Sequence, residues 1–158
     1  MNKKEILDWE IEFDFEFTNK YYENLPYITD GCTCLNCANY EEACEYIIPE
    51  MKMLSIELGI DLKKPCDLFY CRDYDDGTCL YWAGYDVIGR IVKGDDKVEK
   101  ISKCGIKKNS RIPVVPQKRT LADGFEICFY SLPPILIDGL EYPRITLDLN
   151  GIFLRVVK

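Results

Sequence analysis

The chain contains no histidine. Histidine is the commonest general base at neutral pH, the usual partner of serine and cysteine nucleophiles, and a frequent zinc ligand. Its absence excludes Ser-His and Cys-His catalytic pairs and every zinc site that contains histidine. The sequence also has no phosphate-binding glycine loop and no G-x-S-x-G nucleophile motif. These absences favour a protein that is not an enzyme.

Long apolar runs are missing as well. A transmembrane helix needs about 18 consecutive apolar residues, and no stretch of this sequence approaches that length. The first eight residues, Met1 to Asp8, place acidic side chains where a signal peptide needs an apolar core. We therefore expect a cytoplasmic protein without a membrane segment.

Positive charge is scarce. Twenty Lys and Arg residues stand against 27 Asp and Glu residues, which gives a formal net charge of −7. Such a chain repels phosphate backbones on average, so nucleic acid is not an expected partner. A basic protein is the partner that this charge favours.

The length of 158 residues is typical of one domain, and we predict a single domain over residues 1–158. With 47% hydrophobic residues the chain differs from disordered sequences. Many strand-like segments and one helical pattern predict an α+β fold. We expect a mostly antiparallel sheet with one helical region, at about residues 39–58, packed on it.

The N-terminal region alternates strictly between apolar and acidic residues. Period two from Trp9 to Phe17 predicts a half-buried strand. One side of this strand would carry five carboxylates, those of Asp8, Glu10, Glu12, Asp14 and Glu16. Such a face would bind a basic partner or a hard cation, form an ordinary solvated surface, or protect an edge strand from aggregation.

Residues 39–58 repeat apolar side chains every three or four positions, as an amphipathic helix does. Pro49 is placed best in the first turn of the main helix, because proline there loses no hydrogen bond. Gly59 is expected to end this helix.

Turn sequences predict two hairpins. Asp75-Asp76-Gly77 lies between two aromatic-rich runs, and Asn150-Gly151 lies between two β-like runs at the C-terminus. We also predict a strand at Phe125–Tyr130, ended by Pro133-Pro134. The basic segment 107–111 is expected to be an exposed connection.

Nine cysteines are present, an odd number in a chain large enough to fold without disulfides. Cys34 and Cys37 have the C-x-x-C spacing that lets two thiolates bind one metal, and zinc would need two more ligands. Two pairs are candidates for these ligands: Cys32 and Cys44 nearby, or Cys66 and Cys71 from across the fold.

Two other interpretations of the cysteines stay open. Free cysteine is often a small buried apolar residue. Alternatively, a thiol just before a helix is activated by the helix N-terminus, as in thiol oxidoreductases. A thioredoxin-like site, however, normally follows a strand in a βαβ unit, and this pair follows an irregular segment.

Several short motifs resemble those of an uncharacterised family of small bacterial cytosolic proteins, over roughly residues 25–92. The motifs are Cys34-x-x-Cys37-x-Asn39-Tyr40, Leu58-Gly59-Ile60-Asp61, Lys64-Pro65 and Tyr81-x-x-Gly84-Tyr85-x-x-x-Gly89-x-Ile91. The resemblance implies a bacterial cytosolic protein and no catalytic residue. Members of that family often have an acid after Lys-Pro, where this chain has Cys66 before Asp67, either an extra ligand or a substitution.

These observations favour a noncatalytic binding or accessory protein. One version is an immunity-type protein whose acidic face attracts a basic toxin. The alternatives are a zinc-stabilised domain built on Cys34 and Cys37 and a thiol oxidoreductase. No cofactor other than zinc is expected, and the sequence predicts no oligomeric state.

Overall fold

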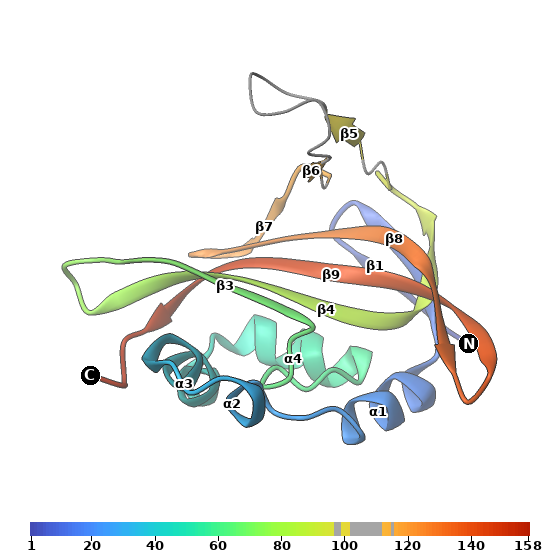
Figure 1. The fold of residues 1–158 in the computed structure, drawn as a ribbon. Helices are drawn as coiled ribbons and strands as arrows, with labels where there is room; N and C mark the ends of the chain where they lie inside the picture. Colours follow the sequence, from blue (N-terminus) through green and yellow to red (C-terminus); the bar gives the residue numbers. More distant parts are fainter. Residues whose placement is uncertain (97–98, 102–111, 115) are drawn as a thin grey trace.

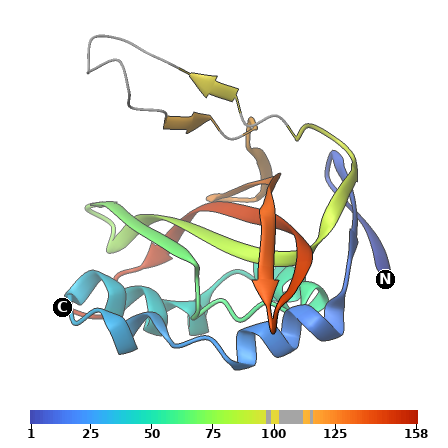
Figure 2. The same cartoon turned by 45° about the vertical axis from the view of Figure 1, so that its right-hand side comes forward.

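The computed structural model describes residues 1–96, 99–101, 112–114 and 116–158, and it describes side chains outside 97–115. The basic segment 107–111 therefore lies outside the described residues. Five helical elements are present among the described residues: α1 (Phe15–Glu23), α2 (Ile28–Gly31), α3 (Leu35–Ala43), the 3-10 helix η1 (Cys44–Tyr46) and α4 (Pro49–Leu58). All of them pack on one face of a large sheet (Figures 1 and 2).

The sheet contains seven antiparallel strands in the order β1-β2-β4-β9-β8-β7, with β3 also paired to β4. They are β1 (Asn2–Ile6), β2 (Trp9–Phe13), β3 (Asp67–Asp73), β4 (Thr78–Lys93), β7 (Arg119–Ala122), β8 (Phe125–Ile137) and β9 (Leu140–Leu154). Two short strands, β5 (Glu99–Ile101) and β6 (Ile112–Val114), pair with each other. The predicted α+β class with an antiparallel sheet and a packed helical region is confirmed.

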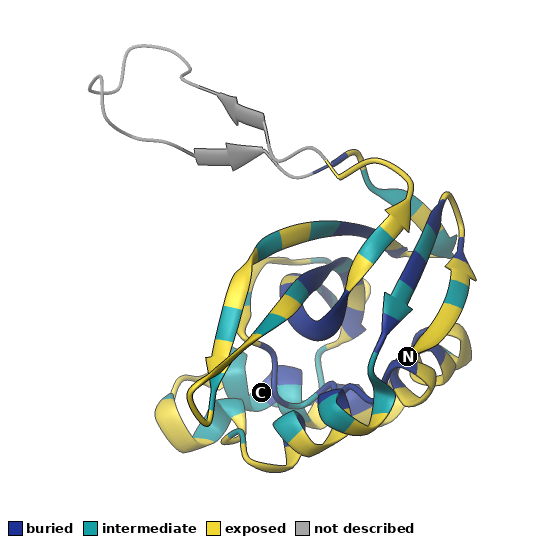
Figure 3. Cartoon of the chain, turned by 90° about the vertical axis from the view of Figure 1, so that its right-hand side faces the viewer, coloured by how far each residue is buried: buried dark blue, intermediate teal, exposed yellow. Residues whose placement is uncertain are grey.

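The core lies between the helices and the sheet. Alternate residues of the two central strands, such as Tyr85 and Leu147, are fully buried and belong to one core cluster with Met51 and Leu58 of α4. Burial of this apolar surface is the main force that holds the two layers together. Buried residues concentrate in this layer, whereas the far end of the β8–β9 hairpin is mostly exposed (Figure 3).

The prediction of the main helix is confirmed, but the predicted helical region covers too few residues at its N-terminal side. Pro49 is the first residue of α4, and Gly59 ends it in the left-handed conformation with φ 75°. Helical structure begins much earlier than residue 39, however. α1 and α2 precede the predicted region, and α3 starts at Leu35.

The predicted strand from Trp9 to Phe17 is wrong beyond Phe13. Asp14 caps α1, and its carboxylate accepts a hydrogen bond from the Phe17 amide at 2.9 Å. An aspartate at this position satisfies an amide that the first helical turn leaves free. The local capping bond therefore overrides the period-two pattern, and Glu16 lies in a helix instead of on a strand face.

The turn at Asp75-Asp76-Gly77 is confirmed between β3 and β4, whereas the predicted Asn150-Gly151 hairpin is wrong. Both residues lie inside β9, where Asn150 pairs with Trp82 of β4. The tight turn is at Asp138-Gly139, where both residues have positive φ (51° and 79°) as a type I′ hairpin requires.

The proline pair also behaves differently from the prediction. β8 continues through Pro133-Pro134 to Ile137, and the pairing register with β9 shifts between Leu132 and Ile135. Prolines fit a sheet at such an irregularity, because the ladder there does not need their missing N–H groups. β8 therefore continues past the prolines with a shifted register instead of ending there.

Candidate metal centre

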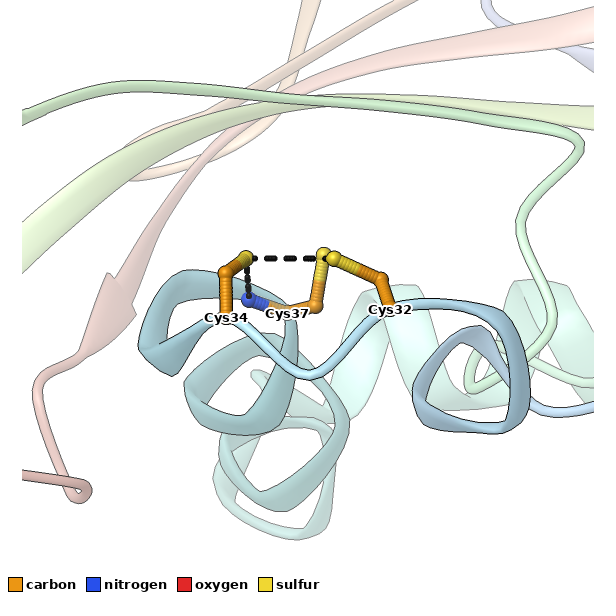
Figure 4. A group of neighbouring side chains, drawn as sticks. All are labelled: Cys32, Cys34 and Cys37. Carbon is orange, nitrogen blue, oxygen red and sulfur yellow. Dashed lines mark hydrogen bonds between the residues drawn. The ribbon is translucent and has the colours of Figure 1, made fainter.

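Three cysteines gather in the short connection between α2 and α3. Cys32 follows the last residue of α2 in extended conformation, Cys34 is the N-cap of α3, and Cys37 is the third residue of α3. Because of this path their side chains point to the same side of the segment (Figure 4). The three Sγ atoms all lie within 4.8 Å of one another.

The Cys34 sulfur accepts two hydrogen bonds from its neighbours. The Cys37 amide donates to it at 3.4 Å, and the Cys32 thiol donates at 3.3 Å. The Cys37 amide is one of those that the start of a helix leaves unpaired. That amide, together with the Cys32 thiol, lowers the pKa of the exposed Cys34 to about 7. Of the two thiols in the C-x-x-C pair, Cys34 is thus the one that loses its proton more readily.

Cys37 behaves in the opposite way. It is partly buried, and burial, together with its hydrogen bonds to Cys32 and Cys34, raises its pKa to about 12. The cluster therefore combines one acidic, exposed thiol with one thiol that keeps its proton. A cation bound among the sulfurs would remove the proton of Cys37 as well, since thiols that bind a metal ion lose their protons.

The connection that carries the cluster is held at both ends. On the α2 side, the amide and hydroxyl of Thr29 donate to the Glu41 carboxylate of α3 at 3.2 and 2.6 Å. On the α3 side, Tyr81 of β4 donates to the Asn36 carbonyl oxygen at 2.8 Å, and Arg155 donates to the Asn36 side chain at 2.9 Å. A site on so fixed a segment is organised before any ligand arrives.

One turn further along α3, Asn39 ties the helix to the C-terminal segment. Its buried carboxamide accepts hydrogen bonds from the Val156 and Val157 amides at 2.8 and 2.9 Å. It also donates to the Leu154 carbonyl oxygen at 3.1 Å. The end of the chain therefore fixes the position of α3 and, with it, of the cysteines.

The other candidate ligands lie apart from this group. The buried Cys44 thiol donates to the Leu62 carbonyl oxygen at 3.6 Å, and the Cys66 thiol donates to that of Gly84 at 3.0 Å. The exposed Cys71 is on β3. Among the described residues, the cluster that could hold a metal ion is formed by Cys32, Cys34 and Cys37.

Several cysteines match the interpretation as small buried apolar residues. Cys44, Cys79 and Cys128 are all buried in the core. Burial raises the pKa of Cys44 and of Cys128 to about 12. Such thiols are inert packing residues, in contrast to the surface cluster.

The acidic N-terminal face does not exist as predicted. β2 holds only Glu10 and Glu12, and Glu12 forms ion pairs with Arg90 at 2.5 Å and Lys3 at 3.1 Å. Asp8 forms an ion pair with Arg119 at 2.6 Å. Basic neighbours on other strands therefore neutralise much of this surface.

Comparisons of the chain with protein-family models, with curated proteins and with solved structures found no match. The resemblance to a bacterial family therefore stays a prediction. Among the described residues, none of the helices has both the length and the apolar character needed to cross a membrane.

Proposed function

We propose that Cys32, Cys34 and Cys37 form a reversible binding site for zinc or a similar thiophilic cation. The observation that carries this proposal is the convergence of three sulfur atoms within 4.8 Å on one surface segment. Zinc–sulfur bonds of about 2.3 Å place tetrahedral ligands about 3.8 Å apart, so the sulfurs need to move by only about 1 Å. Thiolates also prefer zinc and copper(I) to the hard cations.

The site differs from a structural zinc site in its ligand count. Structural zinc has four protein ligands and is closed, whereas zinc with three protein ligands, as in catalytic sites, keeps an open position. Here all three ligands come from residues 32–37, and the apolar layer between helices and sheet is continuous without them. The metal would therefore bind a folded protein, in contrast to the hypothesis of a zinc-stabilised domain.

The two other functional hypotheses stay predictions. The thiol oxidoreductase needs an exposed cysteine in the pair, and Cys34 is exposed. That hypothesis gives no role to the third sulfur, and α3 follows α2 instead of a strand. The noncatalytic hypothesis also rests on the missing histidine and nucleophile motifs, but its immunity-type version relied on the acidic face, and the ion pairs of Glu12 and Asp8 weaken that part.

Cobalt(II) titration of the reduced protein tests the proposal, because cobalt in thiolate sites gives sulfur-to-metal charge-transfer absorption. We expect saturation at one cobalt per chain. Cys34→Ser and Cys37→Ser should each weaken binding by more than about 100-fold, since even loss of a residue behind the ligands costs 10–100-fold. Cys71→Ser, which removes an exposed thiol outside the cluster, is the matched control and should bind like the wild type.

Two results would contradict the proposal. One is the absence of charge-transfer absorption at stoichiometric cobalt. The other is an equal loss of affinity in Cys71→Ser and Cys34→Ser, which would mean that the metal binds thiols without regard to the cluster.

A further inference from the structure

A cavity of about 420 Å³ lies beside the cysteine cluster. Its lining comes from the end of α1, the connection to α2, α2 itself with the following Cys32, and residues 64–66 that precede β3. Tyr21, Leu25 and Tyr27 give it apolar and aromatic walls, and Cys32 and Lys64 add polar groups. A volume of this size and a lining of this kind are typical of sites for small molecules.

Cys32 belongs both to the cysteine cluster and to the cavity wall. The three side chains lie on one side of the segment that joins α2 and α3 (Figure 4). A metal held by three protein thiolates has one ligand position left. Because Cys32 is shared, a molecule that occupies the cavity lies beside one of the three sulfurs that would hold the metal.

Lys64 gives the cavity a positive charge that the protein compensates only in part. The residue is 9% exposed, and its Nζ donates to the Tyr22 carbonyl oxygen at 2.7 Å. Within the described part of the chain its one ion-pair partner is Asp61, at 3.9 Å, which is too long for a hydrogen bond. The ammonium also lies 4.9 Å from the centre of the Tyr27 ring.

A lysine ammonium has three N–H donors, and a buried charge is expensive without a close counterion. One donor is used on Tyr22, so Lys64 can pair with an anion that enters the cavity. A carboxylate fits this position, because it accepts charge-assisted hydrogen bonds from an ammonium. The cavity therefore favours a ligand with a negative charge at one end and an apolar body.

We infer that the cavity binds a low-molecular-weight thiol that carries a carboxylate, with its sulfur on the metal and its carboxylate on Lys64. On binding, the thiol would lose its proton to bulk water, and its sulfur would replace the water molecule that otherwise fills the fourth position of the metal. This inference rests on the proposed function, since it requires a metal on Cys32, Cys34 and Cys37.

The test uses cobalt-loaded full-length protein and two probes, 3-mercaptopropionate and 2-mercaptoethanol. Both offer one thiol, and only the first has a carboxylate. We expect 3-mercaptopropionate to increase the sulfur-to-cobalt absorption and to bind at least about tenfold more tightly than 2-mercaptoethanol, which corresponds to 1.4 kcal/mol. Lys64→Met should remove this preference. Lys63→Met, which loses an exposed ion pair with Glu45, should keep it.

The outcomes separate the two proposals. If cobalt gives no thiolate absorption before either probe is added, the metal site itself is wrong. If cobalt binds normally and the two probes bind equally, only the carboxylate inference fails. This comparison uses the wild-type protein, so it tests the inference even when Lys64→Met does not fold. The cobalt-loaded protein could also show four-thiolate absorption before any thiol is added. If Cys66→Ser loses this absorption, the fourth ligand is Cys66, and the inference is overturned.

Discussion

At the residue scale, position on a helix decides how each cysteine behaves. Cys34 and Cys37 are three residues apart, yet one is exposed at the helix start and the other is partly buried in the first turn. The free amides at the helix start stabilise a thiolate at Cys34, whereas burial disfavours the charge at Cys37. Two identical side chains therefore have pKa values on opposite sides of the ordinary value.

Alkylation of the reduced, metal-free protein by iodoacetamide checks this difference. The thiolate is the reacting form, so the rate at Cys34 should rise with pH and reach half its maximum near the pKa of about 7. The pKa of Cys37 is raised to about 12, so Cys37 should stay unreactive over the same range. Peptide mass spectrometry from about pH 5 to 10 measures each site separately. A midpoint for Cys34 near the ordinary value of about 8.5 would contradict this account.

The sequence predicted part of the site. The C-x-x-C spacing and the nearby Cys32 indicated a metal ligand set, because that pattern is local. The separation of Cys44 from the cluster was not predictable, since it follows from the turn of η1 into the core. Lys64 was missed because nothing in its neighbourhood in the sequence shows that the chain buries it beside Tyr27.

At the element scale, pairing partners outweighed local turn chemistry. Asn-Gly is the strongest hairpin sequence, yet Asn150 and Gly151 lie within β9 because their neighbours pair with β4 on one side and β8 on the other. Gly151 is needed for packing, since a Cβ there would lie 2.6 Å from the Phe125 ring. Gly151 is thus a glycine because the Phe125 ring lies so close, although the pair Asn-Gly in a sequence suggests a turn.

A pair of substitutions distinguishes the two roles. Gly139→Asn should cost less than about 1 kcal/mol, because asparagine tolerates the left-handed conformation and nothing lies within 4 Å of the added Cβ. Gly151→Asn should cost about 3 kcal/mol, because the side chain overlaps the Phe125 ring. Urea unfolding of both variants measures these costs. If Gly151→Asn cost as little as Gly139→Asn, the packing role of Gly151 would be contradicted and the predicted turn at Asn150-Gly151 would be supported.

At the scale of the whole molecule, the α+β class followed from composition and periodicity, and the topology did not. Alternation and turn sequences are local, whereas the order β1-β2-β4-β9-β8-β7 depends on contacts between distant segments. The same long-range contacts position the site, as the bond from Arg155 to Asn36 shows. The metal site is therefore a local feature on a fold that distant residues hold in place.

Native mass spectrometry of the reduced, zinc-loaded protein, followed by thermal unfolding after chelation, tests the central claim most directly. We predict one zinc per chain in the wild type and none in the Cys32, Cys34 and Cys37 triple serine variant. After chelation the protein should lose its zinc and still unfold cooperatively, because the core is complete without the metal. A zinc-free wild-type mass would refute the site, and unfolding on chelation would make the zinc structural instead of exchangeable.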